Sequence, residues 1–214
     1  MSNRRTLWTE ALTKQSRPER DPIAVQSTNF CGKVLGIDPS LRGSGFAVLE
    51  AIDAHTVRYI TSLTLKLTAR RSFTECLGEI FSATQRLLEE YAVCAVAVEQ
   101  TVYVQNFRTA HILGSARGAC LAAVALQGVP VSEFAPLRIK KAVTGLGQAT
   151  KTQVAHMTAR LLHLPDVLPT DESDAAAAAL CYLFSLKSMN ERAFSFSMRT
   201  SGCSSAWQST RFGT

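Results

Sequence analysis

The sequence predicts an α/β fold, a mixed five-stranded sheet with helices on both faces. Three strand-like segments open the central part of the chain, and helix-like and strand-like segments alternate after them. A later segment, Val93 to Val98, is an unbroken run of small and branched apolar residues, typical of a strand buried on both faces. The chain has 214 residues, of which 46% are hydrophobic and 19% charged, values that suit one globular domain with terminal extensions.

The first three strands are expected to be antiparallel. An apolar run at 33–38 ends in an acid, and a turn with one proline and two glycines leads into a second strand at 46–49. A third strand is expected at 57–67, where apolar and polar residues alternate. The strand at 93–98 and a last one at 129–135 complete the sheet.

Helices are expected between and after the later strands. Apolar residues fall at helical spacing over 72–91, and the segment 106–127 is helical and rich in Ala and Gly. Three more helices are expected at 136–143, 150–162 and 171–187.

The two ends of the chain differ in composition from its centre. Residues 1–30 are polar, contain two prolines and show no sustained periodicity, so we expect a disordered N-terminal extension. Residues 188–214 hold seven serines and are expected to form a Ser-rich C-terminal tail. Residues 31–187 are then the folded domain.

Cysteine usage and hydropathy predict a cytoplasmic protein without membrane contact. The first thirty residues contain no continuous apolar segment, and the longest apolar stretch, Ala175 to Phe184, is ten residues long, too short to cross a bilayer. Six cysteines are scattered without a CxxC pair, which indicates reduced thiols. The net charge of +6 is compatible with nucleic-acid binding, but solvated lysines and arginines explain it equally well.

Four carboxylates are expected to meet at one edge of the sheet. Asp38 and Glu99 each directly follow a predicted interior strand, where α/β proteins tend to bind ligands. Asp171 and Asp174 lie three residues apart at the start of a helix and so project from one face. Oxygen donors without a neighbouring histidine or cysteine suit Mg²⁺ or Mn²⁺ rather than zinc.

Each acid also has an ordinary structural explanation. Asp38 precedes a proline, as is common in turns, and Glu99 ends a strand. Asp171 and Asp174 are favoured by the dipole at a helix N-terminus. For any one acid taken alone, the structural explanation is stronger than a role in metal binding. Together, however, the structural explanations do not explain why both interior strands end in an acid.

Five segments carry a family resemblance. They are Val34-Leu-Gly-Ile-Asp38-Pro-Ser-Leu-Arg-Gly-Ser-Gly-Phe46; Val98-Glu99-Gln100 with Asn106; Gly114-Ser-Ala-Arg117-Gly118; Ile139-Lys140 through Gly145-Leu-Gly147 to Lys151; and Asp171-Glu-Ser-Asp174-Ala175. In order and spacing they resemble the motifs of the RuvC family of Holliday junction resolvases over residues 33–187. Ser40 replaces the glycine that is usual after the proline.

The resemblance implies an RNase H-like fold and a homodimer that resolves four-way DNA junctions by symmetric paired nicks in recombination and repair. It gives the catalytic and metal-binding roles to Asp38, Glu99, Asp171 and Asp174. Two Mg²⁺ ions per active site, for which Mn²⁺ substitutes, would support in-line attack that leaves 5′-phosphate and 3′-hydroxyl ends. The branch-migration proteins RuvA and RuvB are partners by resemblance only.

The resemblance also points to DNA-binding residues. The family's basic residues near the scissile strand fall on Lys140 and Lys151, and Arg138 and Lys141 lie close by in sequence as further phosphate contacts. For Arg138 and Lys141 a solvated helix face is the alternative.

The segment after Glu99 supplies the remaining expected DNA contacts. The family's loop here carries an aromatic that stacks on the opened junction, which makes Tyr103 the candidate, and Asn106 is expected at the DNA as well. Small residues over 114–119 permit close contact with a second subunit, although packing on the chain's own sheet is the alternative. Phe107 is expected in the core or in the interface.

Three other functions are alternatives to junction cleavage. ATP-binding proteins of the sugar kinase and actin class share an acid and glycines after the first strand, but they need a second lobe for which this chain has no room. A protein that binds junctions without cutting them has no reason to keep four carboxylates against a polyanion. A nuclease of the same fold that acts on other branched or RNA-containing DNA stays open.

Overall fold

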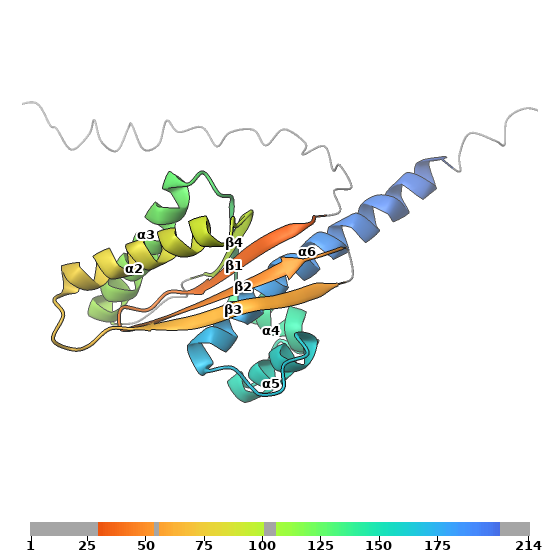
Figure 1. The fold of residues 1–214 in the computed structure, drawn as a ribbon. Helices are drawn as coiled ribbons and strands as arrows, with labels where there is room; N and C mark the ends of the chain where they lie inside the picture. The colour runs from red at the N-terminus through yellow and green to blue at the C-terminus, as the bar shows by residue number, and fades with distance from the viewer. Residues whose placement is uncertain (1–29, 54–55, 101–105, 202–214) are drawn as a thin grey trace, which may run out of the picture.

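The computed structural model describes residues 30–53, 56–100 and 106–201 (Figure 1). Five strands and five helices lie in these ranges, close to the segments that periodicity predicts. In chain order they are β1 (Gly32–Asp38), β2 (Gly43–Ala51), β3 (Val57–Lys66), α2 (Phe73–Glu90), β4 (Ala95–Glu99), α3 (Phe107–Leu126), β5 (Val131–Phe134), α4 (Pro136–Thr144), α5 (Lys151–Leu161) and α6 (Thr170–Ser201).

The five strands form one mixed sheet in the order β3-β2-β1-β4-β5. β1 pairs antiparallel with β2, and β2 pairs antiparallel with β3. β4 is parallel to both β1 and β5. The helix α2 connects β4 to β3, which runs in the same direction as β1, and α3 connects β4 to β5. Ile37 pairs with Val98, so the next residues, Asp38 and Glu99, end the neighbouring strands β1 and β4 at the same end of the sheet.

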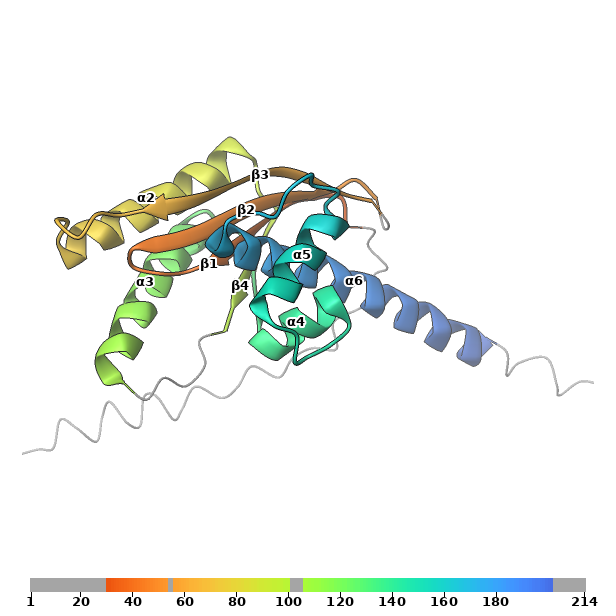
Figure 2. The ribbon, with the colours of Figure 1, turned by 90° about the horizontal axis from the view of Figure 1, so that it is seen from below.

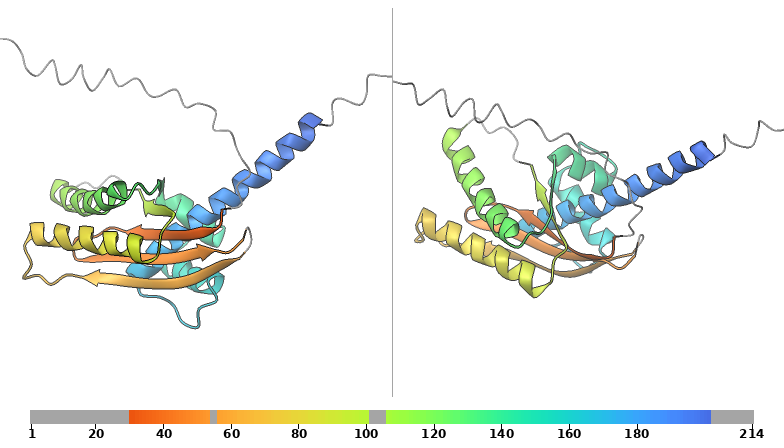
Figure 3. Two further views of the ribbon diagram at one scale, coloured as in Figure 1. Left: turned by 45° about the horizontal axis from the view of Figure 1, so that its top comes forward. Right: turned by 90° about the horizontal axis from the view of Figure 1, so that it is seen from above.

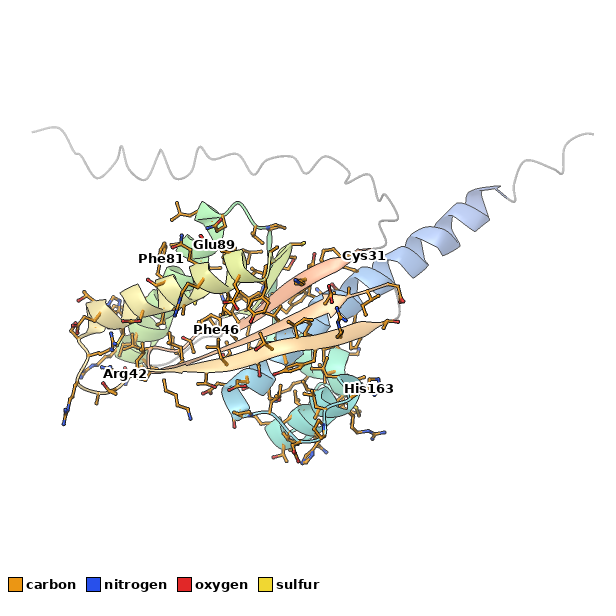
Figure 4. All side chains as sticks on the ribbon, viewed as in Figure 1. Cys31, Arg42, Phe46, Phe81, Glu89 and His163 are labelled. Atoms are coloured by element: carbon orange, nitrogen blue, oxygen red, sulfur yellow. The ribbon has the colours of Figure 1, made fainter. Side chains whose placement is uncertain are left out.

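Helices cover both faces of the sheet, as predicted (Figures 1 and 2). α2 and α3 pack on one face, over a core that includes Leu35, Ile37 and Phe46 (Figure 4). α6 packs on the other face across β1 and β2, and α4 and α5 lie against α6. Side chains alternate along each strand, so successive residues of β1 enter the two cores in turn.

Two glycines allow α6 to lie directly on the sheet. A Cβ atom on Gly36 would lie 1.9 Å from the carbonyl oxygen of Ala175, and one on Gly45 would lie 2.0 Å from that of Asp171. The sequence predicts Gly45 as part of a turn, but it lies inside β2, where a larger residue would collide with the helix backbone. The first turn of α6 is thereby held against β1 and β2, beside Asp38.

α6 is longer than the sequence predicts. The helix expected over 171–187 continues to Ser201, and its last turns project beyond the sheet (Figure 3). No glycine or proline occurs over 188–201, so nothing in the sequence interrupts a helix there. The division into a folded domain and two terminal extensions remains a prediction.

Candidate active site

The strand ends direct two acids to the α6 side of the sheet. Val34 packs in the core on that side, and Asp38 follows it at an even spacing along β1. Glu99 follows Ala97 of the same core in the same way along β4. Both side chains are partly buried. The expectation that two interior strands end in acids pointing to one place is therefore confirmed.

The first turns of α6 bring the other two acids to the same edge. Asp171 Oδ2 lies 3.2 Å from the point where a Cβ atom of Gly43 would stand, beside the start of β2. Asp174 lines a small open pocket together with Glu99, Lys140 and Lys151. Pro136, Ile139, Val154 and Ala177 form its apolar walls. The four acids thus gather at one end of the sheet, as the sequence predicts.

The charges of these acids interact strongly. Burial, followed by the charges of Asp174, Glu99 and Asp171, raises the pKa of Asp38 to about 7, although the Lys151 ammonium opposes the rise. Burial and the charge of Asp174 also raise the pKa of Glu99. An acid whose ionised form is disfavoured by its neighbours is stabilised by any cation that binds among them.

The donor set fits a hard divalent cation. Its members are four carboxylates, and among the described residues that line the pocket beside them there is no histidine or cysteine. In the described ranges no group of three or more such side chains is placed so that it could hold a metal ion. Metal binding by these acids is therefore a proposal that rests on the type of donor and on the charges that raise the pKa of Asp38.

Two lysines accompany the acids. Thr150 caps α5 in a capping box with Gln153, so Lys151 is the first residue of the helix. Its Nζ lies 3.2 Å from Asp174 Oδ2, and this contact raises the pKa of Lys151. Lys140, on α4, lines the same pocket. These are the two basic residues that the resemblance places near the scissile strand.

The other expected DNA contacts lie outside this pocket or have structural partners. Arg138 stacks over the Phe134 ring, 5.0 Å from its centroid, and Lys141 is exposed near the end of α4. Asn106 is the N-cap of α3, where its side-chain oxygen accepts two backbone N–H bonds. Tyr103 lies outside the described residues. Their DNA contacts stay predictions.

Sequence reasoning assigned no role to Arg117, which supports the end of β4. Its guanidinium donates a hydrogen bond to the carbonyl oxygen of Glu99 at 2.7 Å and forms an ion pair with Glu133 of β5. It therefore fixes the backbone of a catalytic candidate from the opposite face. The only signal in the sequence is its place in the third family-like segment, since a partner 18 residues away is not visible as a local pattern.

Residues 34–182 match the family described as Crossover junction endodeoxyribonuclease RuvC. The chain belongs to the RuvC family. The family's enzyme from Halorhodospira halophila is 43% identical over 150 residues, which cover 70% of this chain and 89% of that relative. The enzyme from Geobacter sulfurreducens is 39% identical over 150 residues, which cover 70% of this chain and 91% of that relative.

The fold is shared with solved RuvC structures. Thermus thermophilus RuvC in complex with its Holliday junction substrate is 31% identical, with a TM-score of 0.70 over 74% of this chain and 97% of that chain. The predicted RNase H-like fold is thus confirmed. All four acids and both pocket lysines of this RuvC-family chain lie inside the matched range.

Proposed function

We propose that this chain is a metal-dependent endonuclease that resolves Holliday junctions by symmetric paired nicks during recombination and repair. The observation that carries the proposal is the gathering of Asp38, Glu99, Asp171 and Asp174 at one end of the sheet, where burial, followed by the charges of the other three acids, raises the pKa of Asp38 to about 7. A cluster of this charge beside two lysines suits a cation-assisted reaction at a phosphodiester.

The four acids are proposed to hold two Mg²⁺ ions, for which Mn²⁺ substitutes. Such ions, when bound, polarise the scissile phosphate, activate the attacking water and stabilise the leaving oxygen. Lys151 and Lys140 flank the acids and would neutralise the phosphate on either side of the cut. Glu99 and Asp38 are held by strand backbone, so their carboxylates are already oriented before DNA arrives.

The outward face of α3 supports the proposed homodimer. Ala116 and Cys120 face the chain's own core and are fully buried, whereas Gly114 and Gly118 face open space. Phe107 on that outer face is 85% exposed, which excludes the core and leaves the interface as its expected place. Two subunits related by a two-fold axis would place two active sites on one junction, as paired nicks require.

α3 is also, by length and composition alone, apolar enough to cross a membrane. Its inner face packs against α2 and the sheet, which uses part of this apolar surface within the chain. A second subunit would cover more of it. We accordingly propose a cytoplasmic dimer that acts on DNA, with docking to RuvA and RuvB proposed from the family resemblance alone.

Cleavage of a synthetic mobile four-way junction tests the proposal. With Mg²⁺ or Mn²⁺ the full chain is expected to make symmetric nicks whose ends a ligase can seal, and chelation of the metal is expected to stop the reaction. A linear duplex and an RNA–DNA hybrid are the comparison substrates. Equal cutting of the hybrid would assign the chain to a different nuclease activity, and junction binding without cutting would make it a binding protein.

Removal of the Lys151 ammonium is expected to slow cleavage. Lys151→Ala leaves the Asp174 carboxylate without its cationic partner and removes one charge that faces the substrate phosphate. We expect a single-turnover rate lower by about 10-fold or more, because pre-oriented charges at a reacting phosphate contribute this much or more. Arg160→Ala, an exposed cation at the other end of α5, is the control. Equal rates for the two variants would assign Lys151 to the solvated surface.

A further inference from the structure

A row of hydroxyl groups on β3 faces the first turn of α6. The pairing of β2 with β3 shifts between Val48 and Leu49, so β3 contains one extra residue at Ile60. Because of this bulge Tyr59 and Ser62, which a regular strand would place on opposite faces, meet on the same face, where their hydroxyls are 2.8 Å apart.

Glu172 receives the hydrogen bonds of this row. Ser62 Oγ donates to one oxygen of its carboxylate, and Thr64 Oγ1 donates to the other at 3.1 Å. Since the Ser62 proton is used in this way, the Tyr59 hydroxyl donates to Ser62. Hydrogen bonds to an ionised carboxylate are the stronger kind, so Glu172 joins α6 firmly to the edge strand of the sheet.

The joint lies directly beside the acids. Asp38 pairs with Gly45 across β1 and β2, and Gly45 pairs with Thr64 across β2 and β3, so the three residues form one row across the sheet. Above this row the carbonyl oxygen of Asp171 presses on Gly45 and the carboxylate of Glu172 is bound to Thr64. The position of the first turn of α6 is therefore fixed at two adjacent points.

A favourable interaction with the helix dipole does not account for this arrangement. An acid in a first turn gains from the dipole while it is solvated, and it needs no partner on another strand. Glu172 instead binds two hydroxyls more than a hundred residues away in sequence, one of which is oriented by a third. Its side chain is thereby directed to β3, whereas Asp174 lines the pocket.

We propose that Glu172 is a positioning residue for the metal site: clamped by Ser62 and Thr64, it holds the helix turn that carries Asp171 and Asp174 in register with Asp38. The inference rests on the proposed function in one respect, that these acids hold the divalent ions. Neither the resemblance nor the comparisons assign a role to Glu172 or to the β3 hydroxyls.

Mn²⁺ binding to the full chain, followed by the electron paramagnetic resonance signal of the free ion, tests the proposal without relying on cleavage. Glu172→Ala is expected to weaken Mn²⁺ binding by about 10-fold or more, the size of effect that loss of an orienting partner has at metal sites. Glu172→Gln is expected to stay within about 3-fold of the wild type, because an amide can still accept from one hydroxyl and donate to the other. Thr64→Val, which removes one of the two bonds, is expected to lie between them.

The matched control is Glu50→Ala. Glu50 also bonds a partner across β2 and β3, the exposed Arg58, but at the end of these strands away from the acids. The same four variants are compared in junction cleavage over a range of Mg²⁺ concentrations and in metal-free junction binding. Glu172→Ala is expected to raise the Mg²⁺ concentration needed for half-maximal cleavage and to leave the dissociation constant for the junction unchanged.

Three outcomes would overturn the inference. Wild-type Mn²⁺ affinity in a folded Glu172→Ala protein would show that the clamp does not affect the site. Equal loss in Glu172→Gln and Glu172→Ala would make Glu172 a charge contributor or ligand instead of a positioning residue. If Glu172→Ala does not fold, unchanged Mn²⁺ binding by Thr64→Val decides against the clamp. A wild-type chain that binds Mn²⁺ but cuts no junction would contradict the proposed function alone.

Discussion

The Asp38→Asn protein is expected to bind a four-way junction and leave it uncut. The substitution keeps the shape of the side chain at the end of β1 and removes a charge that interacts with all three of the other acids. Changes that act on a metal site only through its ligands already cost roughly 10–100-fold, so loss of a ligand is expected to reduce cleavage by more than that. Junction binding should survive or tighten, because one charge that repels phosphate is gone.

The same substitution is expected to stabilise the metal-free protein at high pH. The pKa of Asp38 rises from 3.8 to about 7 on folding, so the folded chain holds this proton more tightly than the unfolded chain. Above about pH 7 the ionised carboxylate costs the fold at most roughly 4 kcal/mol, and the cost disappears as the pH falls toward 4. Asp38→Asn removes that cost, so its gain in unfolding free energy should be largest near pH 8.

Three measurements at pH 5 and pH 8 check these expectations. They are junction cleavage with Mg²⁺, junction binding, and thermal unfolding of the metal-free protein in the presence of a chelator. Asp166→Asn is the control, since Asp166 is exposed in the connection between α5 and α6. Residual cutting near the wild-type rate would remove Asp38 from the catalytic set. An inactive variant that is no more stable than the wild type at pH 8 would mean that ionised Asp38 costs the folded chain little free energy.

Gly45→Ala is expected to disrupt both the fold and the site. The added methyl group would stand 2.0 Å from the carbonyl oxygen of Asp171, and this neighbour is helix backbone, which cannot rotate away as a side chain could. We expect a loss of about 3 kcal/mol or more in unfolding free energy, at the upper end of the usual cost of overpacking. Any folded protein that remains should bind divalent metal poorly, because Asp171 and Asp174 move away from Asp38 with the helix.

Gly78→Ala is the matched control for this substitution. A Cβ atom on Gly78 meets nothing within 4 Å, and the residue lies in the middle of α2, so alanine there should stabilise the chain by up to about 1 kcal/mol. Denaturant unfolding and junction cleavage compare the two variants with the wild type. Wild-type stability for Gly45→Ala would show that α6 does not rest on β2 at this point.

Much of the fold could be predicted because it is carried by local patterns. The strand at 93–98 was evident from its uninterrupted apolar run, and it corresponds to β4. The positions of Asp38 and Glu99 after buried runs, and the spacing of Asp171 and Asp174, predicted that the four would meet, as they do. Each of these signals lies within a few residues of the acid that it concerns.

The supporting contacts could not be predicted, because their partners are distant in sequence. Arg117 on α3 donates a hydrogen bond to the carbonyl oxygen of Glu99 at the end of β4, and Glu172 accepts one from Thr64, which is 108 residues away in sequence. Gly45 was interpreted as a turn residue because a glycine that makes room for a helix has the same sequence signal as one that bends the chain. The continuation of α6 past residue 187 could not be predicted, because serine-rich composition is typical of a tail even where no glycine or proline interrupts a helix.

The alanine run that follows Asp174 restricts which substitutions this enzyme can accept during evolution. Residues 175–179 are each at most 1% exposed and belong to the core in which α6 packs between the sheet and the helices α4 and α5. A bulkier side chain in this run would displace the helix that carries two of the four acids, so we expect selection to retain these alanines as strictly as the charged residues. In a survey of all single substitutions, we expect these five alanines to tolerate replacement as poorly as the catalytic acids, although their methyl groups take no part in the reaction.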